Sequence, residues 1–372
     1  MCKSAISGKE LVMIEKMIYG ADAILAALKG VSRQGGRAYL PCGEYTVDKT
    51  IVVDTPSSRL EGEVWSYSSD PNGVFESDYG TKLRLSDKGY PAISVGVNQI
   101  PAGVSVTNLG VYGGIEGMDT RPLLDINNIS DCSGLHFGGY RVDQGEFSKL
   151  SFCGLATAIC VTDQAELDAC TFERVNTDGC AIGIYFAPRA SYYTFFRRCI
   201  VADTPSYGFF ADGTHANMHN LELNDLSFVR NCGSNPLGTE NAAIYLKNIN
   251  RALLRDNLID YPGVFWYFEP HATSNKERQP SKTTAIGLKV EGDKNRILSN
   301  IFTHSSCESI VINGNENVLM NNLSDGDVLI EGEGNTVVNQ VFTMPEARLM
   351  LKGAAAEHTL VIGVPEERIV RV

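Results

Sequence analysis

The sequence LKVEGDKNRILSN at residues 288–300 decides the fold, because modified copies follow it as IVINGNENVLMNN at 310–322 and VLIEGEGNTVVNQ at 328–340. Each copy begins with a strand-like stretch, passes through a polar turn containing glycine and asparagine, and ends with an apolar strand and an amide side chain. Self-similarity at a period of about 20 residues is typical of solenoid folds. We therefore predict that each copy forms one coil of a stack.

Alternation within the strands supports this prediction. Ile310 and Ile312 are expected to point inward while Val311 and Asn313 point outward, because successive side chains of a strand face opposite sides. A coil with a packed interior and a solvated outer face requires this pattern. Amides at equivalent turns can stack from coil to coil and satisfy one another's hydrogen bonds, so we predict a structural role for them: Asn295, Asn317 and Asn335, and Asn300, Asn322 and Gln340.

The same pattern can be followed toward the N-terminus, to about residue 105. Strand-like stretches end comparably at Thr162, Ala187, Ala211, Lys247, Glu269, Glu291, Asn313, Glu331 and Lys352. These positions are 25, 24, 36, 22, 22, 22, 18 and 21 residues apart, a spacing that suits one coil of a parallel β-helix. The sequence predicts an all-β solenoid that occupies residues 51–372 as one continuous domain.

The first 50 residues have a different pattern. Apolar residues recur at helical spacing between Glu10 and Leu28, which predicts one or two amphipathic helices ending near Gly30. The sequence GGRAYLPCGEYTV at 35–47 predicts a short strand, a turn and a second strand. This segment resembles the start of pectate-lyase-like proteins. The resemblance implies a right-handed parallel β-helix whose open end is capped by an N-terminal helix, so residues 1–50 are predicted to form the cap and first strands.

Composition limits the classes of function and partner. The chain has 372 residues and a formal charge of −12, which disfavours a long polyanion such as nucleic acid and favours a neutral oligosaccharide. Its ten cysteines lack CxxC spacing, so most are predicted to be small buried side chains in a reducing compartment. Charges interrupt the N-terminus before any apolar run long enough for a signal peptide, and no stretch suits a membrane span. These features predict a cytoplasmic protein, and no metal site or cofactor is expected.

Carboxylates at the strand ends are the leading catalytic candidates. The alignment of coils groups Asp163, Asp212, Glu269 and Glu291 at or just past the end of one row of strands. Two such carboxylates can serve as acid and base, or as acid and charge stabiliser, in the cleavage of a glycosidic bond. The alternative is that they are solvated turn residues at the edge of the sheet.

Two of these acids have further candidate groups nearby. Asp212 is followed by His215, and Glu269 lies between the aromatic pair Trp266 and Tyr267 and the imidazole of His271. Exposed aromatic rings bind the apolar faces of sugars, so the aromatic pair is predicted to contact substrate, although alternate aromatics of a strand can instead belong to the core.

The sequence NTDG at 176–179 resembles a motif of polygalacturonase-type hydrolases. That family has a second aspartate two residues after the glycine, where this chain has Ala181, and its downstream paired-acid DD and GHG motifs are also missing. Asp178 therefore stays a lower-ranked candidate acid, with an Asx turn as the alternative.

Other substrate contacts are predicted at Arg197, Arg198 and Trp65. The arginines follow an aromatic stretch, and either can bind a sugar hydroxyl or form a salt bridge to a carboxylate. Trp65 lies in the polar segment 61–79, which interrupts the repeat as does 270–284. Long loops within a regular scaffold are often functional rims or interfaces.

The sequence LKVEGDKNRILSNIF at 288–302, with the coil after it, resembles inulin fructotransferases. The resemblance implies a trimeric β-helix enzyme in which an acid assists cleavage of a fructosyl bond while a neighbouring hydroxyl attacks, giving a cyclic difructose anhydride. Where the acid pair of that family is expected, this chain has Glu240 and Asn241 and then Lys247, Asn248 and Arg251, so Glu240 is the one candidate.

These observations lead to a carbohydrate-active enzyme that cleaves or rearranges a glycosidic bond in a neutral oligosaccharide by general acid catalysis from a carboxylate near Asp212, Glu240 or Glu269. A homo-oligomer, with a trimer as the expected form, follows from the resemblance. Two alternatives stay open: a uronate lyase or epimerase, and a non-catalytic carbohydrate-binding β-helix of the tailspike or adhesin kind.

Overall fold

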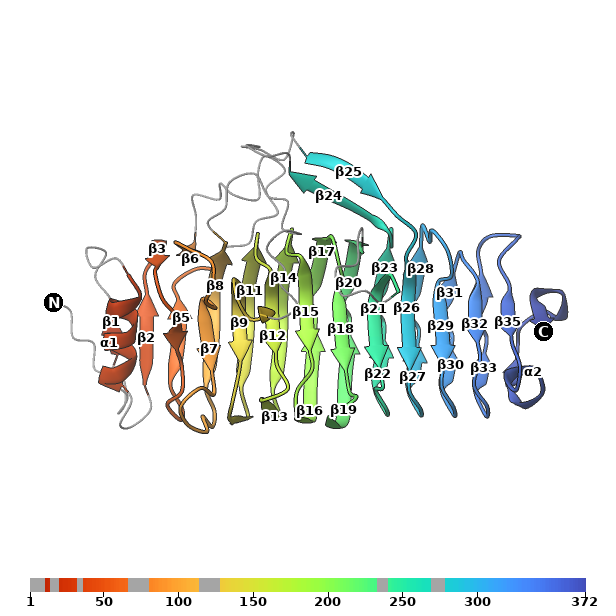
Figure 1. The fold of residues 1–372 in the computed structure, drawn as a ribbon, viewed down its shortest axis with the longest axis horizontal. Helices are drawn as coiled ribbons and strands as arrows, with labels where there is room; N and C mark the ends of the chain where they lie inside the picture. The colour runs from red at the N-terminus through yellow and green to blue at the C-terminus, as the bar shows by residue number, and fades with distance from the viewer. Residues whose placement is uncertain are drawn as a thin grey trace.

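The computed structural model describes residues 11–13, 20–31, 36–65, 80–113, 128–232, 240–268 and 278–372. The molecule is an elongated stack of coils, with helix α1 (Ala21–Val31) at one end and the C-terminus at the other (Figure 1). Two shorter helical turns, α2 (Ala355–His358) and η4 (Glu366–Arg368), lie at the C-terminal end.

One face of the stack is a sheet of parallel strands, to which each successive coil adds one (Figure 1). We call it the long-face sheet. Its strands are β4 (Ile51–Val52), β7 (Ile93–Val95), β9 (Ser133–Phe137), β12 (Thr157–Val161), β15 (Ile182–Phe186), β18 (Phe209–Asp212), β21 (Ala242–Lys247), β26 (Ile286–Glu291), β29 (Ile310–Asn313), β32 (Val328–Ile330), β35 (Leu349–Leu351) and β37 (Ile369–Arg371).

The remaining coil strands form a second sheet, also with parallel pairing between successive coils. We call it the folded sheet, because one or two of its strands follow one another along each coil. Its strands are β1 (Leu11–Met13), β2 (Arg37–Leu40), β3 (Gly43–Val47), β5 (Arg59–Gly62), β6 (Thr81–Leu85), β8 (Ser105–Tyr112), β10 (Arg141–Asp143), β11 (Glu146–Cys153), β13 (Glu166–Asp168), β14 (Thr171–Asp178), β16 (Ala190–Arg197), β17 (Ile200–Thr204), β19 (Asn217–Asn224), β20 (Ser227–Asn231), β22 (Leu253–Arg255), β23 (Leu258–Asp260), β27 (Arg296–Leu298), β28 (Ile301–Thr303), β30 (Val318–Met320), β31 (Leu323–Ser324), β33 (Thr336–Val338), β34 (Val341–Phe342) and β36 (Leu360–Ile362).

The core fills the interior between the two sheets with aliphatic and aromatic side chains. Phe147, Phe172 and Phe196 come from three successive coils, and their ring centroids lie 5.0 and 4.5 Å apart in stacked pairs. All three rings are buried, as are Ile310 and Ile312, which confirms the inward positions predicted from alternation. The hydrophobic effect therefore acts along the whole length of the stack.

Amide ladders connect the later coils, as the sequence predicts. Asn257 Nδ2 donates to Asn300 Oδ1 at 2.8 Å, and Asn300 Nδ2 donates to Asn322 Oδ1 at 3.1 Å. In the other row, the backbone N–H of Asn295 donates to Asn317 Oδ1 at 2.8 Å, and that of Asn317 donates to Asn335 Oδ1 at 2.9 Å. These amides are buried, so each bond satisfies a polar group that water cannot reach.

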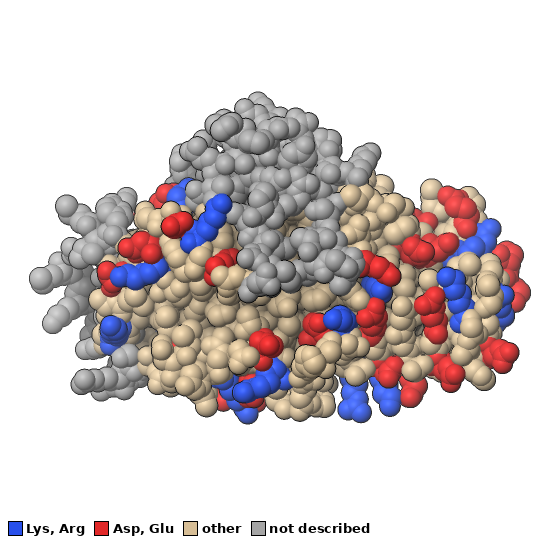
Figure 2. All heavy atoms as spheres, in the orientation of Figure 1, with Lys and Arg blue, Asp and Glu red and all other residues tan. Residues whose placement is uncertain are grey.

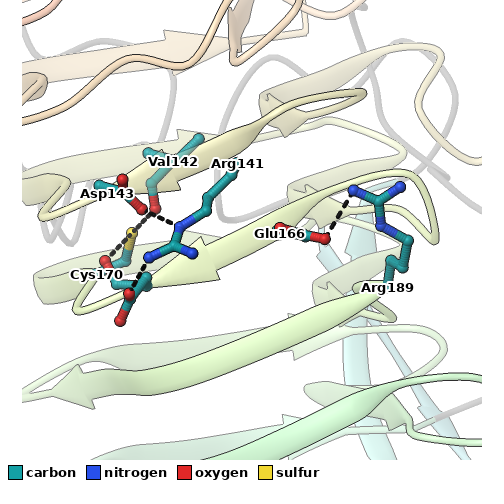
Figure 3. A network of polar contacts seen from close by, with 7 residues as sticks. Arg141, Val142, Asp143, Glu166, Cys170 and Arg189 are labelled. Carbon is teal, nitrogen blue, oxygen red and sulfur yellow. Dashed lines mark hydrogen bonds and ion pairs between the residues drawn. The ribbon is translucent and has the colours of Figure 1, made fainter.

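Cysteines occupy the same two rows in the earlier coils. The Cys170 thiol donates to the carbonyl of Val142 at 3.4 Å (Figure 3), and the Cys199 thiol donates to the carbonyl of Phe172 at 3.7 Å. Strand register places Cys170 in the row of Asn295 and Cys199 in the row of Asn300. Burial raises the pKa of both thiols to about 12, which keeps them protonated as donors.

The described cysteines are free thiols, as expected for small buried side chains. Seven are buried, whereas Cys42 and Cys307 are half-buried.

Ion pairs connect neighbouring coils on the outer surface of the folded sheet. Arg141 contacts both Asp143 and Asp168, and Arg189 pairs with Glu166 at 2.7 Å (Figure 3). In the described part of the chain, no helix is long and apolar enough to cross a membrane.

The N-terminal segment differs in part from the prediction. The helix begins at Ala21, whereas Leu11–Met13 form strand β1, which pairs in parallel with β2. Pairing with an open sheet edge outweighs the helical spacing of these apolar residues. The predicted strand, turn and strand at 35–47 are confirmed as β2 and β3, and the buried Tyr45 donates its hydroxyl to the Pro41 carbonyl at 3.0 Å.

The prediction of a coil strand ending at Glu269 is wrong. Strand β24 (Val264–Phe268) pairs with β25 (Arg278–Lys282) in an antiparallel hairpin that projects from the stack, while β21 pairs directly with β26 beneath it (Figure 1). A hairpin strand has the same period-two alternation as a coil strand, so periodicity alone could not separate them. At the base, Gly263 has φ +84°, and a Cβ atom there would lie 2.3 Å from the Thr283 carbonyl oxygen.

We predict that Asn300→Ala lowers the free energy of unfolding by about 3 kcal/mol, because it leaves buried groups of Asn257 and Leu254 without partners. Equilibrium unfolding in urea, followed by circular dichroism, measures the change. Glu333→Ala at an exposed turn is the control, with an expected change below about 0.5 kcal/mol. Equal effects of the two substitutions would contradict a structural role for the ladder.

Candidate functional site

Three charged side chains and an amide form a row on the outer side of the long-face sheet. Strand register places Asp212, Lys247, Glu291 and Asn313 beside one another in four successive coils. Neighbouring strands are about 4.8 Å apart, so residues far apart in sequence contact each other there. The predicted row of strand-end carboxylates therefore exists for Asp212 and Glu291, whereas Glu269 lies outside the described residues.

Asp212 is held as a carboxylate. Lys247 Nζ lies 2.9 Å from Asp212 Oδ2, and the backbone N–H of Thr214 donates to Oδ1 at 2.8 Å. Burial is the largest influence and acts to raise the pKa of Asp212, but the bonds from Thr214 and Lys247 together hold that pKa below its ordinary value. An ionised carboxylate suits charge stabilisation better than proton donation.

Lys289 bridges Glu291, which belongs to this row, and Glu240 of the preceding coil. Its Nζ lies 2.7 Å from Glu240 Oε2 and 3.0 Å from Glu291 Oε1, and 5.1 Å from the centroid of the Tyr245 ring. Tyr245 donates its hydroxyl to Glu291 Oε1 at 2.7 Å. Only 5% of Lys289 is exposed; burial acts to lower its pKa, yet the bonds to Glu240 and Glu291 raise it above the ordinary value. The pKa of Tyr245 is raised as well, mainly by burial and then by its hydrogen bond to Glu291.

A hollow of about 400 Å³ opens next to this network on the same face. Three glutamates line it at Glu240, Glu308 and Glu331, together with the amides of Asn241 and Asn313. Apolar side chains form its floor at Ile286, Val311 and Leu329. Acids and amides over an apolar floor are the groups that hold a small polar ligand. Figure 2 shows acidic side chains gathered toward the C-terminal end of this face.

An aromatic row continues from the network toward the N-terminus. Tyr185, Phe210 and Tyr245 are register neighbours, with ring centroids 5.6 Å apart in both pairs. The first pair is stacked and the second is edge to face. Phe210 and Tyr245 are buried, whereas Tyr185 is half-buried and is the most accessible ring of the three.

The structure brings two of the predicted catalytic residues, Asp212 and Glu240, onto one face. Asp178 lies at the end of β14 on the folded sheet, apart from that face. His215 is exposed in the turn after Asp212. Trp65 donates its Nε1 hydrogen to Ser151 Oγ at 2.9 Å.

The two predicted arginine contacts lie on the folded sheet and bind carboxylates. Arg197 stacks on the Phe195 ring at 4.5 Å and lies 3.6 Å from Glu222. Arg198 pairs with Glu173 at 3.2 Å. The salt-bridge alternative stated for these arginines is therefore confirmed.

The remaining predicted residues belong to the hairpin region. Glu269 and His271 lie outside the described residues. Trp266 and Tyr267 are in strand β24, which leaves the long-face sheet, and their register partners are Pro280 and Gln279. The two aromatic residues predicted to contact substrate therefore lie on a projecting hairpin and not on a coil strand.

Sequence reasoning missed Lys289, Tyr245, Glu308 and Glu331. A signal existed for Lys289, which occupies an outward position where neighbouring coils carry Tyr245 and Val311. A lysine within such a row predicts buried carboxylate partners. Among the described residues, no group of three or more His, Cys, Asp or Glu side chains is arranged to hold a metal ion.

Comparison with known proteins extends the structural description. No family model and no curated protein matches the sequence. The coils and their parallel register define a right-handed parallel β-helix protein with an N-terminal helical cap, and solved structures agree with this class.

Three of these structures illustrate the likeness. The DFA-IIIase from Arthrobacter chlorophenolicus A6 in complex with GF2 is 15% identical, with a TM-score of 0.65 over 98% of this chain and 93% of that one. The mannuronan C-5 epimerase A-module from Azotobacter vinelandii is 11% identical, with a TM-score of 0.60 over 92% and 100%. ORF18 of Geobacillus virus E2 is 16% identical, with a TM-score of 0.55; the match covers 87% of this chain but 57% of that protein. At these identities the likeness establishes the shared fold.

We predict that Asp212 contributes stability that acid removes. A carboxylate with a lowered folded-state pKa stabilises the protein above its unfolded-state pKa, and this contribution is lost as the pH falls through the folded-state pKa. The difference in thermal stability between the wild type and Asp212→Asn should be largest at neutral pH and vanish in strong acid. Asp163→Asn, at an exposed turn position with no lysine partner in the described structure, is the control substitution.

Proposed function

We propose that this protein is a carbohydrate-active enzyme that cleaves or rearranges a glycosidic bond in a neutral oligosaccharide on the outer side of the long-face sheet. The observation that carries the proposal is the pair Glu240 and Glu291 on one ammonium group beside a hollow lined by acids and amides. The likeness to a mannuronan C-5 epimerase, whose name states a carbohydrate substrate, supports use of this fold for sugars.

Different roles follow from the environments of the two glutamates. The Glu240 side chain is 61% exposed at the rim of the hollow, so it can turn from Lys289 toward the leaving oxygen of a bound sugar. Away from that ammonium group the carboxylate takes up a proton from solvent, and the protonated side chain then acts as the general acid. Glu291 is 29% exposed and fixed by Lys289 and Tyr245, which suits it to face the anomeric carbon as nucleophile or charge stabiliser. When Glu240 turns away, Glu291 still balances the positive charge of the Lys289 ammonium group.

The partition between hydrolysis and rearrangement depends on the acceptor in the second step. If Glu291 forms a covalent glycosyl ester, Glu240 loses its proton to the leaving group and becomes the base that activates the acceptor. Water as acceptor completes hydrolysis, and a hydroxyl of the same substrate gives a cyclic anhydride. Both outcomes restore the proton to Glu240 and release Glu291.

We expect Glu240→Gln and Glu291→Gln each to lower turnover by about 10²-fold or more, because each removes a group that acts on the scissile bond. Mass spectrometry of products from a panel of neutral oligosaccharides, fructans and difructose anhydrides measures the loss and distinguishes hydrolysis from anhydride formation. Glu333→Gln, outside the hollow, is the matched control, and melting temperatures of all variants should agree within a few degrees. Full activity in both site variants, or no turnover by the wild type on any neutral substrate, would contradict the proposal.

If the reaction is hydrolysis, we predict retention of anomeric configuration. Glu240 Oε2 and Glu291 Oε1 both lie within 3.0 Å of Lys289 Nζ, so these two oxygens are less than about 6 Å apart. In inverting enzymes the two catalytic carboxyl groups are separated by roughly 6.5–9.5 Å. Proton NMR of the first product formed identifies the anomer before mutarotation. An inverted product would show that another pair of acids is responsible.

A further inference from the structure

A second groove begins at the corner where the long-face strands end and extends over the outer surface of the folded sheet. Two hollows of about 390 and 460 Å³ share Arg251 and Lys294 in their linings and therefore adjoin each other. Strands β16, β19, β22 and β27 and the turns before them supply the walls. We call this depression the basic groove.

Cations dominate the basic groove although the whole chain has a formal charge of −12. Arg251, Lys294 and Arg296 are all exposed in its lining. Lys294 lies 3.6 Å from Glu316, whereas Arg251 and Arg296 have no carboxylate within ion-pair distance in the described part of the chain. Register places Arg251 beside Lys294, and Arg296 is two residues further along the chain, so three cations converge on one depression and favour an anion there.

The acids of the groove do not neutralise these cations. Glu222 already lies between two other arginines, 3.6 Å from Arg197 and 3.5 Å from Arg255. Asp293 accepts a hydrogen bond from the backbone N–H of Asn315 at 2.7 Å. In Figure 2, lysine and arginine side chains project from the lower edge of the molecule, where β22 and β27 lie in Figure 1.

Aromatic side chains stand at the N-terminal end of the groove. Tyr193 is 54% exposed and has φ +54°, a left-handed conformation that is unfavourable for a non-glycine residue. Asn220, Arg251 and Lys294 share this conformation at the same corner of the three following coils. The corner therefore projects one ring, one amide and two cations at a spacing of about 4.8 Å along the stack. Beside it, Tyr192 and His219 stack with centroids 5.7 Å apart.

Neutral hydrogen-bonding groups complete the lining. Asn217, Asn248 and Asn250 border the hollow next to His219. Amides pair with hydroxyl groups, aromatic faces pair with the apolar faces of sugar rings, and guanidinium groups pair with carboxylates. A sugar chain that carries carboxylates matches all three.

We propose that the basic groove binds an oligouronate, that is, an acidic oligosaccharide lying along the stack with its carboxylates on Arg251, Lys294 and Arg296 and a ring face on Tyr193. This binding does not depend on the proposed glycosidic reaction, because the groove is on a different sheet from Glu240 and Glu291. Nucleic acid fits less well, since a long polyanion would extend beyond the groove over a surface of net negative charge.

Isothermal titration calorimetry of the full chain with a tetrauronate, and with a neutral tetrasaccharide of the same length, tests the proposal. The tetrauronate should bind more tightly, and its affinity should fall as salt is raised. Arg251→Ala with Arg296→Ala should weaken binding at least about tenfold, because two charge-assisted contacts are lost. Tyr193→Ala should weaken binding of the tetrauronate without removing its salt dependence.

Arg59→Ala with Lys88→Ala is the matched control, because it removes two exposed cations elsewhere and changes net charge equally. This control should bind the tetrauronate like the wild type. Equal affinity for acidic and neutral sugars, unchanged binding by the groove variant, or tighter binding of a DNA oligonucleotide than of the tetrauronate would each overturn the proposal. Loss of activity in Glu240→Gln with unchanged tetrauronate binding would separate the two sites.

Discussion

Parallel hydrogen bonding between one coil and the next is the constraint on which the whole structure depends. Each strand satisfies its backbone groups with the strand one coil away, so the register of that pairing decides which side chains meet. Because the spacing is fixed at about 4.8 Å, equal positions in successive coils become rows of neighbours. The phenylalanine stack of the core, the amide ladders at the turns and the charged row on the long-face sheet are three results of this one geometry.

The same constraint explains how polar groups are tolerated inside and against the sheets. A buried amide is costly alone, but a row of amides lets each side chain use the one before and the one after it. Lys289 is stabilised in the same way by charged partners. Glu240 and Glu291 contact its ammonium group from two different coils, and Tyr245 donates a hydrogen bond to Glu291. Glu240 lies 49 residues away in sequence, yet the coil geometry places it within 2.7 Å.

The parts of this architecture that sequence can predict are those with a local period. Asn300 and Asn322 recur at equivalent turns, so their ladder was predictable, and so was the strand, turn and strand around Tyr45. The hairpin at 264–282 was not, because β24 is a short apolar run like that of a coil strand and β25 contains Pro280 and mostly polar residues. Of the candidate site, Asp212 and Glu240 were found as acids, but the role of Lys289 depends on contacts between coils that no single stretch of sequence displays.

The hairpin also shows how such a scaffold accommodates change. The hairpin lies between β21 and β26 in the sequence, yet these two strands pair with each other in the same parallel register as the other coils. An insertion at this point therefore leaves the register of every later coil unaltered. In evolutionary terms, the corners of the stack are places where segments can be gained, lost or exchanged, and new surface chemistry can arise there without a new core.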